Sequence, residues 1–477
     1  MRVLFLIVLL SPQAGISAGA EAQQETLALT YVTVIDATGA PARPDMTLVI
    51  AGGRITEIGM TGKVSVPGDA LVVDAAGMFL IPGLWDMHAH TSYKQFLKLF
   101  IANGVTGVRD MGGTPEEFAR LRQWRRQIAD GTILGPRIVA AGIHVDGPKP
   151  LGRPDSLHVA NRNGARQAVN FLKQGGADFV KVYSMLPREA YFAVAAEAKK
   201  QGLAFAGHVP PCVSAAEAAD AGQRSMEHLF GILTACSKDE ANLMKETAAA
   251  VMKSGVAAFV RAEIHAQMKA LDSYDPKKAE GLFARFRKNG AWQVPTLVGW
   301  QSLSRADDER LLSDVRGKYI PPERLASWKT QSAGFLGSLG ADYLANRHRL
   351  LEKQLELVGA MRRAGVELMA GTDTAALYVY PGFSLHDELA LLVRAGLTPM
   401  EALQCATRNP AKYLGMLDSL GTVEKGKIAD LVLLEADPLA DIANTKKIAA
   451  VVVGGRLIRK AELQEMLHEV ERGPDSQ

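Results

Sequence analysis

Residues 81–90 read IPGLWDMHAH, an apolar run that ends in two histidines, His88 and His90. Side chains two positions apart on a β-strand point to the same face, so Asp86, His88 and His90 share one face at the end of a predicted strand. Two neutral imidazoles that converge in this way are well placed to bind a metal ion. Taken alone, the pair is equally compatible with two ordinary polar residues at a strand exit.

Through the middle of the chain, short apolar segments alternate with helical ones, which is the pattern of βα units and a parallel sheet. Eight such strands close a (β/α)₈ TIM barrel, so we expect an α/β fold of this kind. Residues 232–290 and 299–350 are helical and longer than simple crossovers, and we expect them to form a lid over one end of the barrel. The predicted strands lie near residues 84–90, 104–109, 137–143, 178–183, 203–208, 223–228, 292–298 and 366–373.

Both ends of the chain have a β-rich pattern, in residues 26–80 and again after residue 420. Because chain termini often lie close together, these pieces predict one small β-sandwich domain built from both ends. The predicted organisation is a signal peptide (1–22), the first part of the small β-domain (23–80), the TIM-barrel domain with its lid insertions (81–414), and the second part of the small domain with a C-terminal helix (415–477).

The N-terminus has the organisation of a secretory signal. Arg2 precedes an apolar stretch over residues 3–10, and Ala20-Glu21-Ala22 fits an A-x-A cleavage site. We therefore expect an exported protein, periplasmic or secreted. The apolar stretch is too short to span a bilayer, so no membrane span is expected after cleavage.

The composition excludes some classes of partner and of crosslink. The net charge is +3, with 54 Lys+Arg against 51 Asp+Glu, which gives no electrostatic case for nucleic acid. Three cysteines, Cys212, Cys236 and Cys405, do not make a disulfide framework. We expect unpaired thiols, although Cys212 and Cys236 could still bridge in an oxidising compartment.

Lys181 lies within the strand-like segment DFVKVYS, residues 178–184. In a barrel both faces of a strand are covered, so this lysine is expected to be buried, and a buried ammonium tends to lose its proton. A neutral lysine amine can take up CO₂ to form a carbamate, which is a carboxylate-like bridge between two metals. The alternative is a lysine paired with a nearby Asp or Glu.

Three further strand ends carry candidate ligands. GLAFAGHVP ends near His208, QRSMEHL near His228, and VELMAGTDTA carries Asp373 on a Gly-Thr-Asp turn. A lone histidine of this kind is more often a hydrogen-bonded core residue, and a lone aspartate at a turn is usually a helix N-cap. Barrel closure, however, brings the ends of these strands around one axis. The sequence therefore predicts one dinuclear metal site with six ligands: His88, His90, Lys181, His208, His228 and Asp373.

The segments PGLWDMHAH, VKVY, GHVP, MEHL and AGTD, in this order, resemble those of the amidohydrolase superfamily, the metal-dependent hydrolases with a carboxylated lysine. The tail GTVEKGKIADLVLL is similar to the stretch that returns such chains to their small β-domain. The likeness is nearest to the imidazolonepropionase-related branch, which includes Xaa-Pro and Xaa-Arg dipeptidase-like enzymes and ochratoxin-type amidases. The resemblance implies a zinc-dependent amidohydrolase that acts on carbon–nitrogen bonds.

The resemblance also implies a role for each ligand. His88, His90 and Asp373 would hold the more buried of two divalent metal ions, and His208 and His228 would hold the more exposed one. Zinc is the expected metal, which imidazole and carboxylate ligands suit.

The mechanism that the resemblance implies uses a carbamate on Lys181 and a hydroxide as bridges between the two metals. The hydroxide attacks the scissile carbonyl, and Asp373 transfers the proton to the leaving nitrogen as general base and then acid. His144, after the third strand, and Tyr183, on the face of Lys181, are candidates for stabilising the oxyanion and contacting substrate. Each of the two is equally compatible with a structural role.

The loop sequences indicate the substrate class less clearly than the strand ends indicate the metal site. Arg153, in the loop HVDGPKPLGRPD, could make a bidentate contact with a substrate carboxylate, although a surface role is the simpler explanation. Asp110, at the end of the second strand, could touch the site or form an ion pair with Arg109 or another base. The stretches GHVPP and YSMLP depart from the pattern of the dipeptidase-like relatives, which leaves the substrate class open.

Three functions remain at this point. The leading one is cleavage of an amide bond in a dipeptide or an N-acyl amino acid, with a small molecule as the partner. The second is hydrolysis of a cyclic amide, lactone or imino compound at the same site. The third is a ligand- or metal-binding protein on an inactive barrel, which the presence of all six candidate ligands disfavours. A homo-oligomer is compatible with each, but no interface can be recognised in the sequence.

Overall fold

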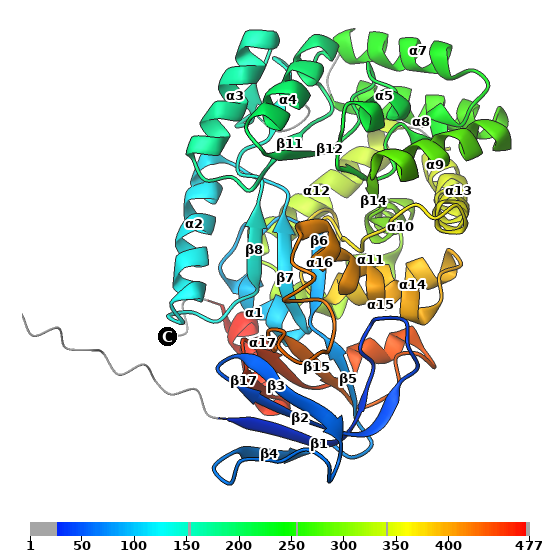
Figure 1. Cartoon of the computed structure of the whole chain (residues 1–477). Helices are drawn as coiled ribbons and strands as arrows, with labels where there is room; N and C mark the ends of the chain where they lie inside the picture. The colour runs from blue at the N-terminus through cyan, green and yellow to red at the C-terminus, as the bar shows by residue number, and fades with distance from the viewer. Residues whose placement is uncertain (1–25, 151–153, 254–255, 340–341, 474–477) are drawn as a thin grey trace, which may run out of the picture.

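The computed structural model describes residues 26–150, 154–253, 256–339 and 342–473. The predicted signal peptide therefore lies outside the described residues. In Figure 1 the two ends of the described chain lie side by side in a small sheet, and the middle of the chain forms a larger α/β unit above it. Within the described residues, no helix has both the length and the apolar character that a membrane crossing requires.

The small sheet has eight strands from both ends of the chain, in the order β17-β16-β15-β5-β1-β2-β3, with β4 paired to β1. The strands form one hydrogen-bonded series, because β5 pairs with β1 on one side and with β15 on the other, and side chains of β1, β2, β15 and β16 share one apolar core. These pairings do not test the predicted β-sandwich, which stays a prediction. Its strands are β1 (Leu27–Val34), β2 (Arg43–Ala51), β3 (Arg54–Met60), β4 (Leu71–Asp74), β5 (Phe79–Pro82), β15 (Leu431–Leu434), β16 (Ile448–Val453) and β17 (Arg456–Arg459).

The larger unit contains two parallel sheets. One has the order β6-β7-β8 and the other β10-β9-β11-β12-β13-β14. Single bridges extend them, including Gln293–Leu368 and Ala89–Thr374, but the ladders of the described residues do not form one closed barrel. The strands are β6 (Leu84–Ala89), β7 (Val105–Asp110), β8 (Arg137–Ala140), β9 (Val145–Asp146), β10 (Leu157–His158), β11 (Phe179–Val182), β12 (Ala204–Gly207), β13 (Ser225–Glu227) and β14 (Trp292–Val294).

Two of the predicted strands differ from the structure. The segment 366–373 lies between β14 and β6, where the N–H of Met369 donates to the carbonyl of Gln293 and the carbonyl of Ala370 accepts the N–H of Met87, but it forms single bridges rather than a regular strand. The predicted strand 292–298 ends at Val294, since Thr296 adopts a left-handed conformation with φ 49° and a helix begins at Leu297.

The helices begin where the sequence provides caps. Thr114, Ser214 and Thr398 each form a capping box with a glutamate three residues later. The helices around the strands are α1 (Gln95–Ala102), α2 (Pro115–Ala129), α3 (Arg162–Gln174), α4 (Arg188–Lys200), α5 (Ala215–Asp220), α14 (Phe383–Arg394), α15 (Pro399–Cys405), α16 (Arg408–Leu414) and α17 (Lys460–Arg472), with a 3₁₀ turn η2 (Ile442–Lys446).

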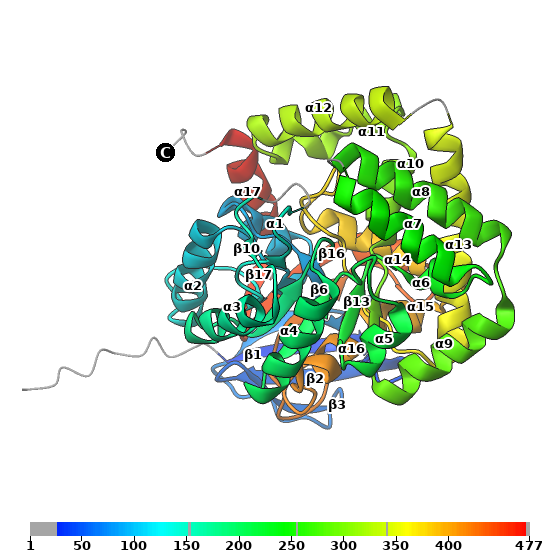
Figure 2. The same ribbon diagram turned by 90° about the horizontal axis from the view of Figure 1, so that it is seen from above.

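The predicted lid segments are helical. Seen from above, α7 and α8 lie side by side, and α12 runs along the edge of the larger unit (Figure 2). The helices of the two segments are α6 (Ile232–Ala235), α7 (Glu240–Lys253), α8 (Val256–Asp272), α9 (Pro276–Asn289), α10 (Leu297–Ser304), α11 (Glu309–Leu312), α12 (Pro322–Leu339) and α13 (Tyr343–Arg363), with a 3₁₀ turn η1 (Val315–Tyr319). The three cysteines are free thiols, as expected.

Candidate metal centre

Five imidazoles and one phenol form a closed circuit of ring contacts at the carboxyl ends of the parallel strands. The residues that bear these rings lie at the end of β6, in the loop before β9, and at the ends of β11, β12 and β13. The ring centroids are separated by 5.7 Å (His88–His90), 5.8 Å (His90–His144), 5.3 Å (His144–Tyr183), 4.1 Å (Tyr183–His208), 5.0 Å (His208–His228) and 4.4 Å (His228–His88). Four predicted ligands and both predicted oxyanion donors therefore share one site.

Asp373 brings its carboxylate to this circuit from the loop after residue 371. Its Oδ1 lies 3.3 Å from Nε2 of His88 and 3.3 Å from Nε2 of His90. One ligand atom each from His88, His228 and Asp373 lies within 4.8 Å of the other two. Burial opposes ionisation of Asp373, but the contacts with His228, His88 and His90 hold the pKa of this carboxyl well below its ordinary value.

Each histidine among the predicted ligands has its Nδ1 atom held by an oxygen, which presents Nε2 as the coordinating nitrogen. This arrangement is typical of metal-binding histidines, whose second ring nitrogen is fixed by a hydrogen bond. The partners of Nδ1 are the carboxylate of Glu227 for His88 (2.8 Å), the carbonyl of Gly112 for His90 (2.7 Å), the hydroxyl of Ser184 for His208 (2.7 Å) and the hydroxyl of Thr296 for His228 (2.7 Å).

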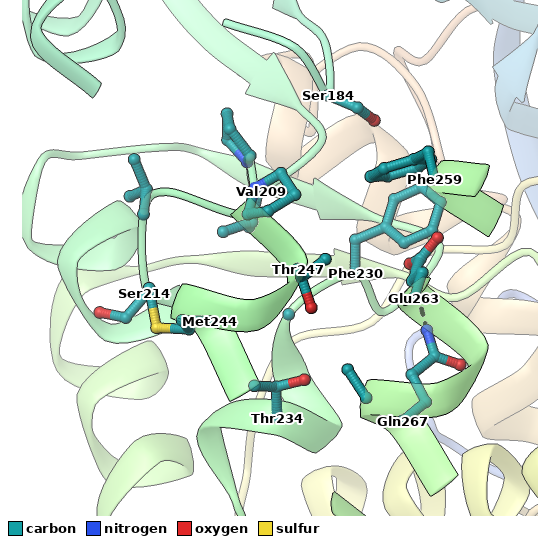
Figure 3. Close-up of a pocket in the computed structure, with 15 residues that line it drawn as sticks. Ser184, Val209, Ser214, Phe230, Thr234, Met244, Thr247, Phe259, Glu263 and Gln267 are labelled. Carbon is teal, nitrogen blue, oxygen red and sulfur yellow. Dashed lines mark hydrogen bonds between the residues drawn. The ribbon is translucent and has the colours of Figure 1, made fainter. Parts of the chain in front are cut away.

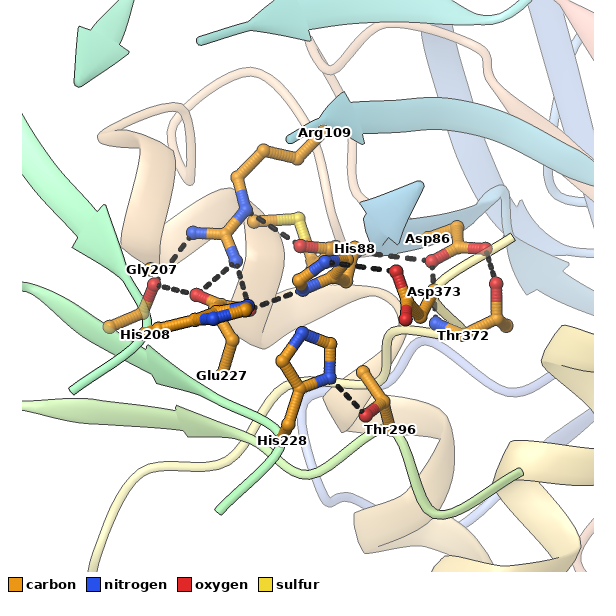
Figure 4. Close-up of polar contacts among 12 residues, drawn as sticks. Asp86, His88, Arg109, Gly207, His208, Glu227, His228, Thr296, Thr372 and Asp373 are labelled. Atoms are coloured by element: carbon orange, nitrogen blue, oxygen red, sulfur yellow. Dashed lines mark hydrogen bonds and ion pairs between the residues drawn. The ribbon is translucent and has the colours of Figure 1, made fainter. Parts of the chain in front are cut away.

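Glu227 is a functional residue that the sequence analysis missed. Its carboxylate accepts a hydrogen bond from Nδ1 of His88, and its two oxygens both accept from Nη2 of Arg109, at 2.9 and 3.0 Å (Figure 4). Burial alone would raise the pKa of Glu227, but Arg109 and His88 hold it well below its ordinary value. Glu227 and Arg109 are both completely buried. The only sequence signal was the alternation of Ser225 and Glu227 on one face of a short strand.

Asp86 is not part of the ring circuit, but its hydrogen bonds hold two backbone segments that carry ligands. It accepts hydrogen bonds from the N–H of His88 (3.1 Å) and from the N–H and hydroxyl of Thr372 (3.0 and 2.6 Å). Burial raises the pKa of Asp86 to about 6, against these hydrogen bonds. Asp86 thus ties β6 to the turn that carries Asp373, which itself adopts a left-handed conformation with φ 64°.

Lys181 is completely buried on β11, as the sequence predicted. Gly207 on the paired strand gives its side chain room, because a Cβ there would lie 2.8 Å from Cδ of Lys181 and 2.2 Å from the carbonyl oxygen of Val182. The Nζ atom lies 5.9 Å from the ring centroid of Tyr183. This places the amine beside the ring circuit.

His208 and His228 are held in the neutral form that metal ligands need. Burial lowers the pKa of each imidazole well below its ordinary value, and the charge of Lys181 lowers both further. His228 also adopts a left-handed conformation, with φ 62°. Non-glycine residues in this region are uncommon and concentrate at functional sites.

Helix α10 supports the His228 side of the site. Besides the Thr296 contact, the indole N–H of Trp300 donates to the carbonyl of His228 at 3.1 Å. The buried Glu388 on α14 accepts the N–H of Val298 at 2.7 Å and so holds the start of α10. Burial raises the pKa of Glu388 to about 8.

Two substrate-related predictions have different outcomes. Arg153 lies outside the described residues. Asp110 accepts the N–H groups of Thr91 (2.6 Å) and Gly112 (3.0 Å), and of the alternatives left open for it the ion pair with Arg109 does not form, because Arg109 pairs with Glu227. Asp110 therefore fixes the loop beside His90.

The donor set fits a divalent metal. Nε2 of His88 is buried and faces the carboxylate of Asp373, whose Oδ1 lies 3.3 Å away. Neutral imidazoles, an ionised carboxylate and a buried amine converge, and imidazole with carboxylate suits zinc and its neighbours. His88, His228 and Asp373 would hold a metal, with His90, His208 and Lys181 beside them.

The sequence profile of the amidohydrolase family matches residues 79–458. The chain belongs to the amidohydrolase family. Imidazolonepropionase of Maricaulis maris (strain MCS10) is 32% identical over 184 residues, which cover 35% of this chain and 42% of that protein. The match thus spans less than half the length of this relative.

Solved structures share the amidohydrolase fold, a TIM-barrel type of α/β fold with a second domain. A Xaa-Pro dipeptidase with bound methionine has a TM-score of 0.65 and 21% identity, and covers 91% of this chain and all of its own (100%). Bottromycin amidohydrolase has a TM-score of 0.71 and 24% identity, and covers 92% of this chain and 88% of its own.

Proposed function

We propose that this amidohydrolase is an exported enzyme that cleaves the carbon–nitrogen bond of a dipeptide or an N-acyl amino acid. The observation that carries the proposal is the donor group of His88, His228 and Asp373, whose ligand atoms lie within 4.8 Å of one another. The names of two structural neighbours, a Xaa-Pro dipeptidase and bottromycin amidohydrolase, favour an amide or peptide bond. Export rests on the signal-like residues 1–22.

The proposed site holds two divalent ions, with zinc as the expected metal and a CO₂-derived carbamate on Lys181. His88, His90 and Asp373 would take one ion, and His208 and His228 the other. Bound divalent metal supplies acidity to a water molecule and polarises the scissile carbonyl.

The protein's own groups move the proton and orient the substrate. The side chain of Asp373 is 27% exposed, against 1% for His88 and 9% for His90, so its carboxylate can be reached from outside. It accepts the proton of the attacking water and returns it to the leaving nitrogen. His144 and Tyr183 flank the same space and are the donors we assign to the developing oxyanion.

The test is to assay the zinc-supplemented protein against dipeptides and N-acyl amino acids, before and after treatment with a chelator. Chelation should abolish hydrolysis. Lys181→Ala should also abolish it, and a small carboxylic acid such as propionate should restore part of the activity by replacing the carbamate. Lys200→Ala, at a lysine whose side chain is 75% exposed, is the matched control. Hydrolysis that survives both chelation and Lys181→Ala would contradict the proposal.

A second candidate is hydrolysis of a cyclic amide, lactone or imino compound. The similarity to imidazolonepropionase favours it. The same panel with cyclic amides and lactones added separates the two, since each function predicts activity on one class of substrate.

A further inference from the structure

A small cavity adjoins the metal centre and is covered by the lid helices. Two of its lining residues also touch the centre: Ser184 bonds His208, and the ring of Phe230 lies 4.7 Å from that of His208 and 5.2 Å from that of His228. The cavity volume is about 50 Å³. At roughly 10–15 Å³ for each water-sized group, it has room for about four such groups.

The walls of this cavity are mainly apolar. Val209 and Pro210, which follow His208, line the cavity together with Phe230 and with Phe259 on α8. Figure 3 shows Glu263 and Gln267 on the same helix, facing the cavity. The apolar walls favour an aliphatic or aromatic group, while the α8 side offers polar contacts.

Glu263 is the one ionisable residue among those that line the cavity. It accepts a hydrogen bond from Nε2 of Gln267 at 3.1 Å, and this is its only hydrogen bond within the described part of the chain. Burial raises the pKa of Glu263 to about 7, and Arg347 and Gln267 oppose this rise. A cation or other donor in the cavity would favour the ionised carboxylate, whereas a second carboxylate would be repelled.

We propose that this cavity is the specificity pocket for one side chain of the substrate, and that Glu263 selects a short arm that ends in a hydrogen-bond donor. This deepens the proposed function and rests on it. The arm is apolar along its stem, has about four or five non-hydrogen atoms, and ends in an ammonium or an amide. Arms that end in a carboxylate are rejected.

The test compares amide substrates in which only the arm changes: ornithine, glutamine, leucine and glutamate, placed on either side of the scissile bond. These arms are similar in length and differ at the tip. We expect the ornithine and glutamine substrates to exceed the glutamate substrate by about tenfold or more in kcat/KM, because a charge-assisted contact is gained in one case and a repulsion appears in the other.

Glu263→Gln separates charge from shape. The ornithine substrate should lose about tenfold in kcat/KM, the glutamate substrate should gain, and the leucine and glutamine substrates should change little. Glu246→Gln on α7 is the control, since the Glu246 side chain is 52% exposed and lies outside the cavity lining. If the wild type accepts glutamate as well as glutamine, or if Glu263→Gln changes all four substrates equally, the assignment of the pocket is wrong.

Calorimetry with the free amino acids gives a readout that does not depend on turnover. Ornithine and glutamine should bind more tightly than glutamate, and Glu263→Gln should remove the advantage of ornithine. If no linear amide is hydrolysed while this binding order holds, the proposed function fails and the pocket stands. If amides are hydrolysed without any such order, the pocket fails and the function stands.

Discussion

His88 and His208 both present an imidazole at the end of a parallel strand, yet different groups hold their Nδ1 atoms. For His88 the partner is the carboxylate of Glu227 at 2.8 Å, and for His208 it is the hydroxyl of Ser184 at 2.7 Å. Glu227 is in turn paired with the buried Arg109, whereas Ser184 lines the cavity under the lid. The comparison extends to His228, which is held by the hydroxyl of Thr296.

This difference divides the site into two halves. We call the half of His88, Glu227 and Arg109 rigid, and the half of His208 and His228 adaptable. A charged hydrogen bond is about twice as strong as a neutral one, and the buried Glu227–Arg109 pair fixes the partner itself. The hydroxyl partners are neutral, and one of them, Ser184, also lines the cavity under the lid. We infer that the His88 half maintains the chemistry, while the His208 half can change with the substrate.

The largest effect is expected at Asp373, which touches the rigid half. Asp373→Asn keeps the shape of the side chain and removes its ability to carry a proton, so kcat should fall by about 10³-fold. Asp272→Asn, at a side chain that is 70% exposed, should leave kcat unchanged. Steady-state kinetics on the best amide substrate measures both, and a loss of less than tenfold for Asp373→Asn would remove Asp373 from its proposed role.

Glu227→Gln tests whether the charged partner of His88 contributes to stability and to metal binding. It leaves the buried Arg109 guanidinium without its counter-charge, so the free energy of unfolding should fall by about 3 kcal/mol or more. Zinc affinity should fall by roughly 10–100-fold, as is usual when the partner of a ligating histidine is lost. Glu367→Gln, which breaks the exposed pair with Lys412, should lower stability by less than about 1 kcal/mol. Urea unfolding and zinc titration are the measurements. Equal effects of Glu227→Gln and Glu367→Gln would contradict the division of the site into two halves.

The two halves should also respond oppositely to pH. Glu388, which holds the start of α10 behind Thr296, keeps its proton up to about pH 8 in the folded state, whereas the ordinary glutamate value is 4.5. The folded chain binds more protons in this interval, so Glu388 stabilises the fold at low pH and this contribution is lost as the pH rises toward 8. For Glu227, whose pKa is lowered, the stabilisation is present above its unfolded pKa and is lost as the pH falls below that value.

Glu388→Gln isolates this effect, because the amide cannot ionise. Relative to wild type, the Tm of the variant should rise by roughly 4 °C between pH 5 and pH 8, at about 1.4 kcal/mol per pKa unit and about 2 cal/mol/K of unfolding entropy per residue. Thermal melts in buffers across this range measure it. Parallel pH profiles for variant and wild type would show that Glu388 ionises normally in the folded chain.

The smallest effect is expected at Thr296, on the adaptable half. Thr296→Val keeps the branched shape and removes the hydroxyl that holds His228, which should lower stability by about 1 kcal/mol and zinc affinity by about tenfold. Thr296→Ser keeps the hydroxyl and is the control. A loss as large as that of Glu227→Gln would mean that the hydroxyl and carboxylate supports are equivalent.

The alternation of apolar and polar residues was sufficient to predict most of the parallel strands, because side chains on a strand repeat with a period of two. His88, Lys181, His208 and His228 were recognised as candidate ligands because each stands in or just after such a strand. The eighth predicted segment bonds to β14 and to β6 as expected for its place, but through single bridges without a regular ladder, which the local pattern does not reveal.

By itself, the sequence determined the αβ alternation and the positions of the candidate ligands, since both follow from local periodicity. The pairing of the two β-rich ends followed from the general closeness of chain termini. Only the tertiary structure decided which groups hold those ligands. Glu227 lies 139 residues from His88, and Thr296 lies 68 residues from His228. Such partners meet only after the strands have assembled, and the cavity that Glu263 closes exists only once α8 packs over the end of those strands.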